Sequence, residues 1–142
     1  QLDIAQKYNK PIIVHSRDSI QDIYNILKEY NLKGSIHCFS GSVEMAREFI
    51  KLGYKIGIGG IITYKNAKTI KEVVKDTDLA YILLETDSPY LAPVPHRGED
   101  NNPKYIHIIA DEIASIKWTS SLDIARVTTA NAEAVFDFSC KK

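Results

Sequence analysis

Short apolar runs alternate along this chain with longer stretches in which apolar residues recur every three or four positions. The apolar runs read as strands and cover residues 11–15, 34–38, 54–58 and 81–85. The stretches with helical spacing are 20–30, 43–50, 66–75 and, after a long loop, 106–113. Strands that alternate with helices in this way predict parallel βαβ units, so we expect an α/β protein.

Two further helical segments are expected at the ends of this pattern. Residues 2–8 carry apolar side chains on one side and read as the end of an amphipathic helix. Ser120 with Asp123 resembles a capping box for a segment that runs to Thr128. Asn131 is expected to cap a separate short final turn. A complete (β/α)8 barrel needs eight strands and about 250 residues, so the four strands indicate either a small open sheet or half of a barrel.

Three of the strand-like runs end in side chains that bind metal ions. PIIVH ends at His15, GSIH ends at His37, and LLETD ends at Asp87. Because parallel sheets place their sites at the carboxyl ends of the strands, these three side chains are expected to meet. Imidazoles and carboxylates are common ligands of Zn²⁺ and related divalent ions. Asp87 is also a candidate for the general base that takes a proton from a metal-bound water.

The loop that follows Asp87 is rich in Pro and Gly and adds further ionisable groups. Arg97 has five fixed donors suited to a phosphate, so a substrate clamp is favoured over a structural salt bridge. His96 is a second candidate for substrate binding, with equal weight on a structural role. Glu85 shares a strand face with Asp87 and is expected behind the ligands, orienting one of them or the loop backbone, while direct ligation stays an alternative.

A cysteine and three glycines near these candidates are expected to have structural roles. Cys38 follows His37 on a strand, and adjacent strand residues point to opposite faces, so Cys38 is expected to be a small buried residue behind the site. Gly57, Gly59 and Gly60 lack the spacing of a phosphate-binding loop and are expected to allow close backbone packing at the third strand.

The composition excludes several classes of protein. A chain of 142 residues with 44% hydrophobic and 25% charged residues is typical of one folded domain. It contains no apolar run near the ~18 residues needed to span a bilayer, and a cytoplasmic location is the expectation. The chain has 18 Lys and Arg residues and 18 Asp and Glu residues, so its net charge does not attract nucleic acid. Any phosphate chemistry must therefore come from a local site.

Five segments in order resemble one known family. IVHSRD, IHCFSGS, LLETDSPYLAP, PHRG and TTANAEAVF are together similar to the TatD-type metal-dependent deoxyribonucleases, which are amidohydrolase-like TIM barrels. The resemblance implies a hydrolase that cleaves DNA phosphodiester bonds by metal-activated water. It also implies that His15, His37 and Asp87 are metal ligands on barrel strands five, six and eight, for Zn, Mg or Mn.

The resemblance extends to the C-terminal half of the family pattern. Family members also carry an H-x-H pair on the first strand and a Glu after the fourth, and residues 1–142 contain no counterpart. The expectation is therefore a single partial domain, the C-terminal half of a (β/α)8 barrel. Such a chain is expected to self-associate or to depend on an N-terminal half, with little activity alone. An inactive or assembling fragment, or a hydrolase of another ester or amide, are the alternatives.

Overall fold

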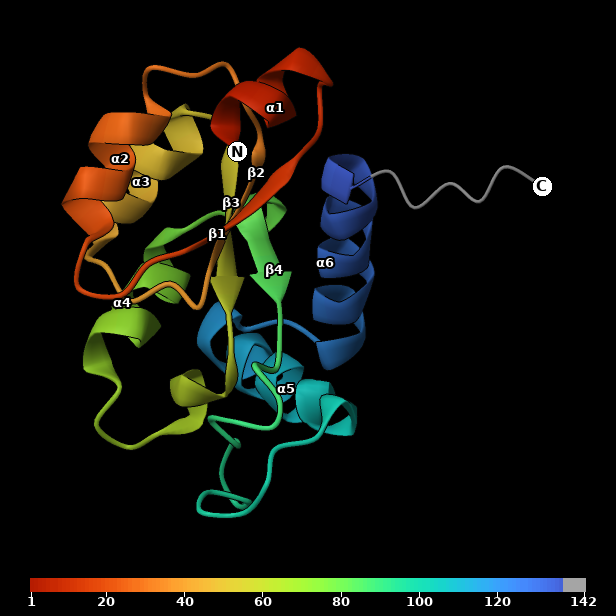
Figure 1. The fold of residues 1–142 in the computed structure, drawn as a ribbon. Coiled ribbons are helices and arrows are strands. Elements are labelled where there is room, and N and C mark those ends of the chain that lie inside the picture. The colour runs from red at the N-terminus through yellow and green to blue at the C-terminus, as the bar shows by residue number, and fades with distance from the viewer. Residues whose placement is uncertain (137–142) are drawn as a thin grey trace.

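Four parallel strands form one sheet whose spatial order, β1-β2-β3-β4, is their order along the chain (Figure 1). The computed structural model describes residues 1–136. The strands are β1 (Ile12–His15), β2 (Gly34–His37), β3 (Tyr54–Ile58) and β4 (Ile82–Leu84). Each lies inside the run predicted for it, and the expected α/β fold with strands and helices in alternation is confirmed.

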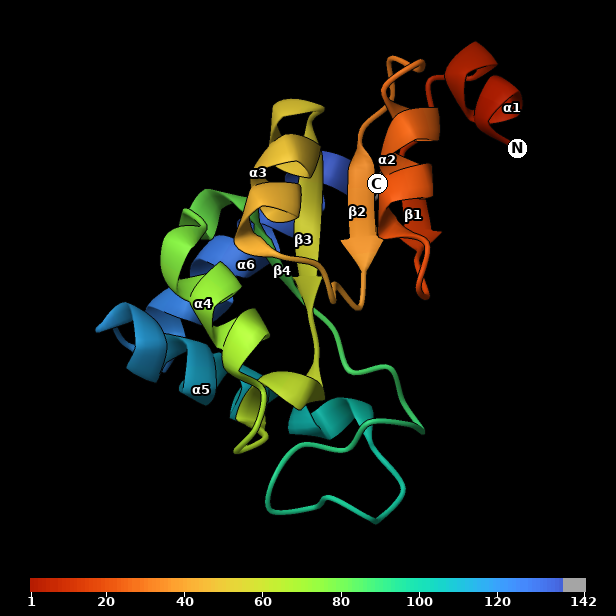
Figure 2. The same ribbon diagram turned by 90° about the vertical axis from the view of Figure 1, so that its left-hand side faces the viewer.

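The helices form a second layer that follows the order of the strands (Figures 1 and 2). They are α1 (Leu2–Lys7), α2 (Ile20–Leu27), α3 (Val43–Lys51), α4 (Lys68–Asp76), α5 (Ile106–Lys117) and α6 (Ser121–Phe136). From α2 to α6, each helix packs against the next one along the chain. Within residues 1–136, none of the helices combines the length and apolar character that crossing a bilayer requires.

The core lies between the sheet and these helices. Ile36, Ile56 and Ile82 point from the strands toward the helices and are fully buried. On the helix side, the ring of Phe49 is also fully buried and makes edge-to-face contacts with three other aromatic rings. Burial of this apolar surface is the main stabilising contribution to the layered fold.

The opposite face of the sheet is open at the β1 end. Side chains alternate between the two faces of a strand, so Ile13 and His15 point away from the face that carries Ile12 and Val14. The Ile13 side chain is 66% exposed. Because His15 pairs with His37 in the parallel register, the two histidines lie on the same face. This open face therefore holds the first two candidate metal ligands.

The C-terminal region differs from the prediction in one respect. Ser120 caps α6 as expected, because its hydroxyl accepts a hydrogen bond from the Asp123 amide and donates one to the Asp123 carboxylate. The prediction that Asn131 caps a separate turn was wrong, since α6 continues without a break to Phe136. The Asn131 amide instead donates to two backbone carbonyls beside β4, at Leu79 and Ile82. The Asn131 side chain, which the local sequence predicts to be a helix cap, therefore forms its hydrogen bonds in a tertiary contact.

Candidate functional site

The site begins with two histidines at the carboxyl ends of adjacent strands. His15 ends β1 and His37 ends β2, and the register places them side by side. Their ring centroids are 5.6 Å apart, with the ring planes tilted by 42°. His15 is exposed, whereas His37 is half-buried. The structure thus brings together the two histidines that the sequence predicted to meet.

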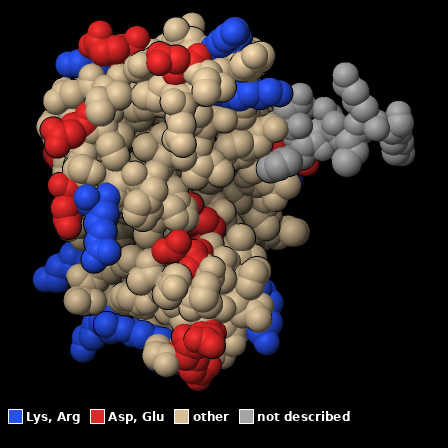
Figure 3. All heavy atoms as spheres, viewed as in Figure 1, with Lys and Arg blue, Asp and Glu red and all other residues tan. Residues whose placement is uncertain are grey.

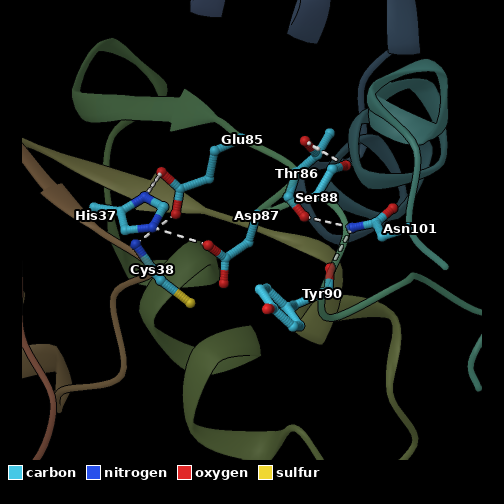
Figure 4. Close-up of polar contacts among 8 residues, drawn as sticks. All are labelled: His37, Cys38, Glu85, Thr86, Asp87, Ser88, Tyr90 and Asn101. Atoms are coloured by element: carbon cyan, nitrogen blue, oxygen red, sulfur yellow. Dashed lines mark hydrogen bonds and ion pairs between the residues drawn. The ribbon is translucent and has the colours of Figure 1, made fainter.

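Asp87 reaches the same place from the segment that follows β4 (Figure 4). Its Oδ1 lies 3.1 Å from His37 Nε2. The other ring nitrogen, Nδ1, lies 2.7 Å from Glu85 Oε2. The imidazole of His37 is therefore held between two carboxylates. Figure 3 shows acidic side chains at this end of β4, in the middle of a face that is otherwise mostly uncharged.

Glu85 occupies the position behind His37. Its second oxygen, Oε1, accepts a hydrogen bond of 2.5 Å from the backbone amide of Cys38. Both carboxylate oxygens of Glu85 are thus engaged by residues 37 and 38. This geometry matches the predicted orienting role, in which a carboxylate fixes the tautomer and direction of a ligating histidine.

A positive charge between the His37 ring and Asp87 would stabilise the contacts of His37. A neutral imidazole carries one N–H, and the shorter contact assigns that proton to Nδ1, facing Glu85. Nε2 then directs a lone pair at a carboxylate oxygen 3.1 Å away, which is repulsive. Either a proton on Nε2 or a bound cation relieves this repulsion. The arrangement is therefore suited to exchange a proton for a metal ion.

Burial and charge act in opposite directions on the pKa values of this group. Partial burial lowers the pKa of His37, but the carboxylates of Glu85 and Asp87 outweigh it, and the net pKa is above the ordinary 6.5. Burial raises the pKa of Glu85, and His37 with the Cys38 amide only partly counters it. In the metal-free protein the two groups therefore hold protons more tightly than they would in water.

Cys38 departs from its predicted place behind the site. Its backbone is left-handed, with φ of +47°, so the alternation of a strand does not extend to it. The thiol lies on the side of Asp87 (Figure 4). Burial raises its pKa to about 11, with the carboxylates of Glu85 and Asp87 adding to the effect. The prediction was wrong because it extended strand geometry one residue past the end of β2.

The donors fit a divalent ion, although they are not preassembled around one. Two ligands bound about 2.1 Å from the same ion lie about 3.3 Å apart, close to the 3.1 Å between His37 Nε2 and Asp87 Oδ1. Within residues 1–136, no three His, Cys, Asp or Glu side chains already surround one metal position. The His15 side chain, the third candidate ligand, is exposed.

His96 and Arg97 both lie on the loop between β4 and α5, and each rests on an aromatic ring. The His96 ring stacks on Tyr105, with centroids 4.0 Å apart, and its Nδ1 lies 3.1 Å from Glu99 Oε2. The Arg97 guanidinium carbon is 4.5 Å from the centre of the Tyr64 ring. Stacking leaves the edge of a guanidinium available to an anion, so the predicted phosphate contact stays a prediction consistent with this placement.

The predicted close packing at the third strand is found at Gly57 and Gly60 but not at Gly59, and Gly57 is part of the site. A Cβ at Gly57 would lie 2.6 Å from Glu85 Oε2, and a Cβ at Gly60 would lie 2.3 Å from the Leu91 carbonyl oxygen. The absence of a side chain at Gly57 therefore creates the space that the Glu85 carboxylate fills beside His37.

We expect Gly57→Ala to displace the Glu85 carboxylate and to lower divalent-metal affinity about tenfold, the usual effect of losing a partner that orients a ligand. Titration calorimetry provides the measurement. Gly59→Ala is the matched control, because a Cβ there meets Glu85 at 3.8 Å, an ordinary contact, and its φ of −109° suits any residue. Equal affinities for the two variants would contradict the role given to Gly57.

The stability of the fold should depend on pH through His37. His37 has a higher pKa in the folded chain than its ordinary 6.5, so its protonation stabilises the metal-free fold. That contribution is fully present below pH 6.5 and is lost as the pH rises through the raised pKa. Urea unfolding at pH values from 6.5 upward should show that the free energy of unfolding falls for the wild type and that His37→Gln lacks this fall. Metal affinity should change in the opposite sense, since a ligand must give up its proton. Parallel stability profiles for the two proteins would contradict this account.

Known proteins share this sequence and fold. The family profile described as TatD related DNase matches residues 1–137. An uncharacterized metal-dependent hydrolase from Bacillus subtilis, YabD, is 44% identical over 139 residues, which are 96% of this chain and 54% of the relative. A similarly described protein from Escherichia coli K12, YcfH, is 39% identical over 95% of this chain and 52% of its own length.

Solved structures agree with these sequence matches. The crystal structure of YjjV, a TatD homolog from E. coli K12, superposes with a TM-score of 0.90 at 32% identity, over 96% of this chain and 53% of that one. A TatD family hydrolase from Entamoeba histolytica gives a TM-score of 0.82 at 25% identity, over 95% and 54%. The chain thus spans about half the length of the relatives it matches.

Proposed function

The chain belongs to the TatD-related DNase family, and from this premise we propose that it carries part of the active site of a divalent-metal-dependent hydrolase of DNA phosphodiesters. The observation that supports the proposal most directly is the His37 ring, fixed by Glu85 on one nitrogen and facing Asp87 with the other. The description of the relatives as metal-dependent hydrolases agrees with this donor set, and the family description supports DNA as the substrate.

We assign metal binding to His15, His37 and Asp87, with Zn, Mg and Mn as the candidate ions. A divalent ion bound by these residues would acidify a water molecule and stabilise negative charge on a phosphate. Glu85 keeps the Nδ1 proton of His37 in place, so that the lone pair of Nε2 would be able to bind a divalent ion. Asp87 is 27% exposed, so solvent reaches its carboxylate.

Asp87 has a second role in this proposal. A carboxylate beside the attacking water can accept its proton, which makes Asp87 the general base for the displacement at phosphorus. The partial exposure of its side chain allows the proton to pass on to solvent. One carboxylate oxygen faces His37, and we assign the proton transfer to the other.

Arg97 and His96 are the proposed contacts to the substrate phosphates. Arg97 lies over the ring of Tyr64, and its guanidinium has N–H donors suited to phosphate oxygens. His96, stacked on Tyr105, adds a second donor on the same loop. We assign contacts with an anionic substrate to these two residues of the loop that follows Asp87.

A cleavage assay tests the proposal and separates it from its closest alternative. The chain is incubated with Zn²⁺, Mg²⁺ or Mn²⁺ and with DNA, a small ester or a small amide. We expect metal-dependent cleavage of DNA that is lost in Asp87→Asn, at a rate well below that of the longer B. subtilis relative. Cleavage of the ester or amide without cleavage of DNA would mean that the substrate is an ester or amide rather than DNA. No metal-dependent hydrolysis of any of the three would contradict the proposed function.

The open edges of the sheet favour a second proposal, assembly with another copy of the chain. β1 and β4 each pair with a strand on one side only. A groove of about 430 Å³ beside β1 is lined by Ile12, Ile13 and Ile23, and one of about 610 Å³ between α5 and α6 reaches β4 at Leu84. A twofold axis along the strands would place β1 of each copy parallel to β4 of the other, forming eight strands.

The mass in solution tests this assembly. We expect light scattering to give twice the chain's 16.0 kDa, and we expect Ile13→Lys to shift the mass toward the monomer because it places a charge in the edge groove. Ile4→Lys is the matched control, since Ile4 is 62% exposed on α1 and does not line that groove. A wild-type monomer would contradict self-association and would leave an N-terminal half as the partner.

A further inference from the structure

A buried asparagine holds the turn that carries Asp87. Asn101 lies in the loop between β4 and α5 and is only 6% exposed. Its side-chain amide nitrogen donates to the carbonyl oxygens of Thr86, at 2.5 Å, and of Tyr90, at 2.7 Å (Figure 4). Its backbone amide donates to the Pro89 carbonyl oxygen at 2.9 Å. One residue therefore binds three carbonyls of the five-residue segment from Thr86 to Tyr90.

That segment has a conformation that needs external support. Asp87 has a left-handed backbone, with φ of +59°, which is disfavoured for residues that carry a Cβ. The Tyr90 amide closes the turn with a hydrogen bond of 2.9 Å to the Asp87 carbonyl oxygen. An unsupported turn of this kind relaxes to other conformations, and each of them would point the Asp87 carboxylate elsewhere.

The chemistry of the contact requires an amide side chain. Asn101 uses both N–H groups of its amide, one for the carbonyl before Asp87 and one for the carbonyl at the end of the turn. Its carbonyl oxygen accepts from the Asn102 amide at 2.8 Å, so the side chain is fully satisfied although it is buried. No smaller polar side chain supplies two donors in one plane at this reach.

We propose that Asn101 is a positioning residue that holds the Asp87 carboxylate in place opposite His37. Asn101 acts through the backbone on both sides of Asp87 and has no contact with the His37 ring among the hydrogen bonds of residues 1–136. The inference rests on the proposed function in one respect, because the benefit of fixing Asp87 is the shared metal ion.

The chain contains a chemically matched control in Asn131. This residue is 9% exposed, and its amide nitrogen also donates to two backbone carbonyls, those of Leu79 at 2.8 Å and Ile82 at 2.9 Å. It fixes the opposite end of β4, away from the carboxyl ends of the strands. Loss of either amide leaves two carbonyls unsatisfied, so the two variants should lose similar stability.

The experiment compares Asn101→Leu and Asn131→Leu, which remove the donors without adding charge. Calorimetric titration with Mn²⁺ and with Zn²⁺ should show about tenfold weaker binding for Asn101→Leu and an unchanged affinity for Asn131→Leu. In an Asp87→Ala background, Asn101→Leu should cause no further loss, because its effect passes through Asp87. Equal affinities for the two leucine variants, or a tenfold loss that persists without Asp87, would overturn the inference.

Two further experiments apply if the leucine variants do not fold or if the wild type binds no metal ion. Asn101→Ser with Asn131→Ser is the milder pair if the leucine variants do not fold. If the wild type binds no metal ion, the proposed function fails, and crystal structures of wild type and Asn101→Ser decide the inference separately. An Asp87 carboxylate displaced from His37 in the variant supports the positioning role, and an unchanged contact overturns it.

Discussion

Replacing Asp87 by alanine is expected to weaken the binding of divalent metal ions strongly. Asp87 is the anionic member of the proposed ligand set, and its Oδ1 lies 3.1 Å from His37 Nε2. Without it, two imidazoles remain, of which only His37 is oriented by a carboxylate. We expect a loss of at least about a hundredfold in affinity, larger than the effect of partners that only orient ligands. Titration calorimetry of wild type and variant gives the comparison.

The control for this prediction comes from the same loop. Asp100 is an exposed carboxylate, so Asp100→Ala removes one negative charge from this loop without removing a proposed ligand. Its affinity should stay close to that of the wild type. Tight binding that survives Asp87→Ala would remove Asp87 from the metal site. Equal losses in both variants would mean that general charge, rather than coordination, determines the affinity.

The largest effect on stability is expected from Phe49→Ala. The Phe49 ring on α3 is fully buried and makes edge-to-face contacts with Tyr24, Phe39 and Tyr54, at centroid distances of 5.7, 6.4 and 6.4 Å. Truncation removes the apolar contacts and leaves a cavity between the helices and β3. We expect the free energy of unfolding to fall by about 3–5 kcal/mol, measured by urea denaturation.

Trp118→Ala provides the comparison for this loss. Trp118 is another large aromatic residue, but it is 92% exposed at the end of α5, so its truncation should change the free energy of unfolding by no more than about 0.5 kcal/mol. A loss below about 1 kcal/mol for Phe49→Ala would contradict its place at the centre of the core.

The strands and the main ligand candidates could be predicted because simple rules determine them. Apolar runs of strand length alternate with helical spacing, and parallel strands deliver their last residues to one edge. These rules placed His15 and His37 together, and the register confirms that pairing. Asp87 could be placed because it follows the fourth strand in the same way, and its contact with His37 bears out the predicted convergence.

The other contacts could not be predicted because they depend on tertiary structure or on backbone conformation outside the regular elements. Cys38 turns toward Asp87 since its φ is positive, which no alternation pattern indicates. Asn101 reaches back to a turn more than ten residues earlier in the chain, and nothing in the Pro- and Gly-rich loop marks that contact. Asn131 likewise makes a contact distant in sequence that local propensity reads as a helix cap.

Anomalous diffraction from crystals of the chain soaked in Mn²⁺ or Zn²⁺ locates a bound metal ion directly. We expect one strong peak at the carboxyl ends of β1, β2 and β4, about 2.0–2.2 Å from a nitrogen of His15, a nitrogen of His37 and a carboxylate oxygen of Asp87. Glu85 should remain on His37 Nδ1, outside the coordination shell. A peak that contacts neither His37 nor Asp87, or no peak at a saturating metal concentration, would contradict the account.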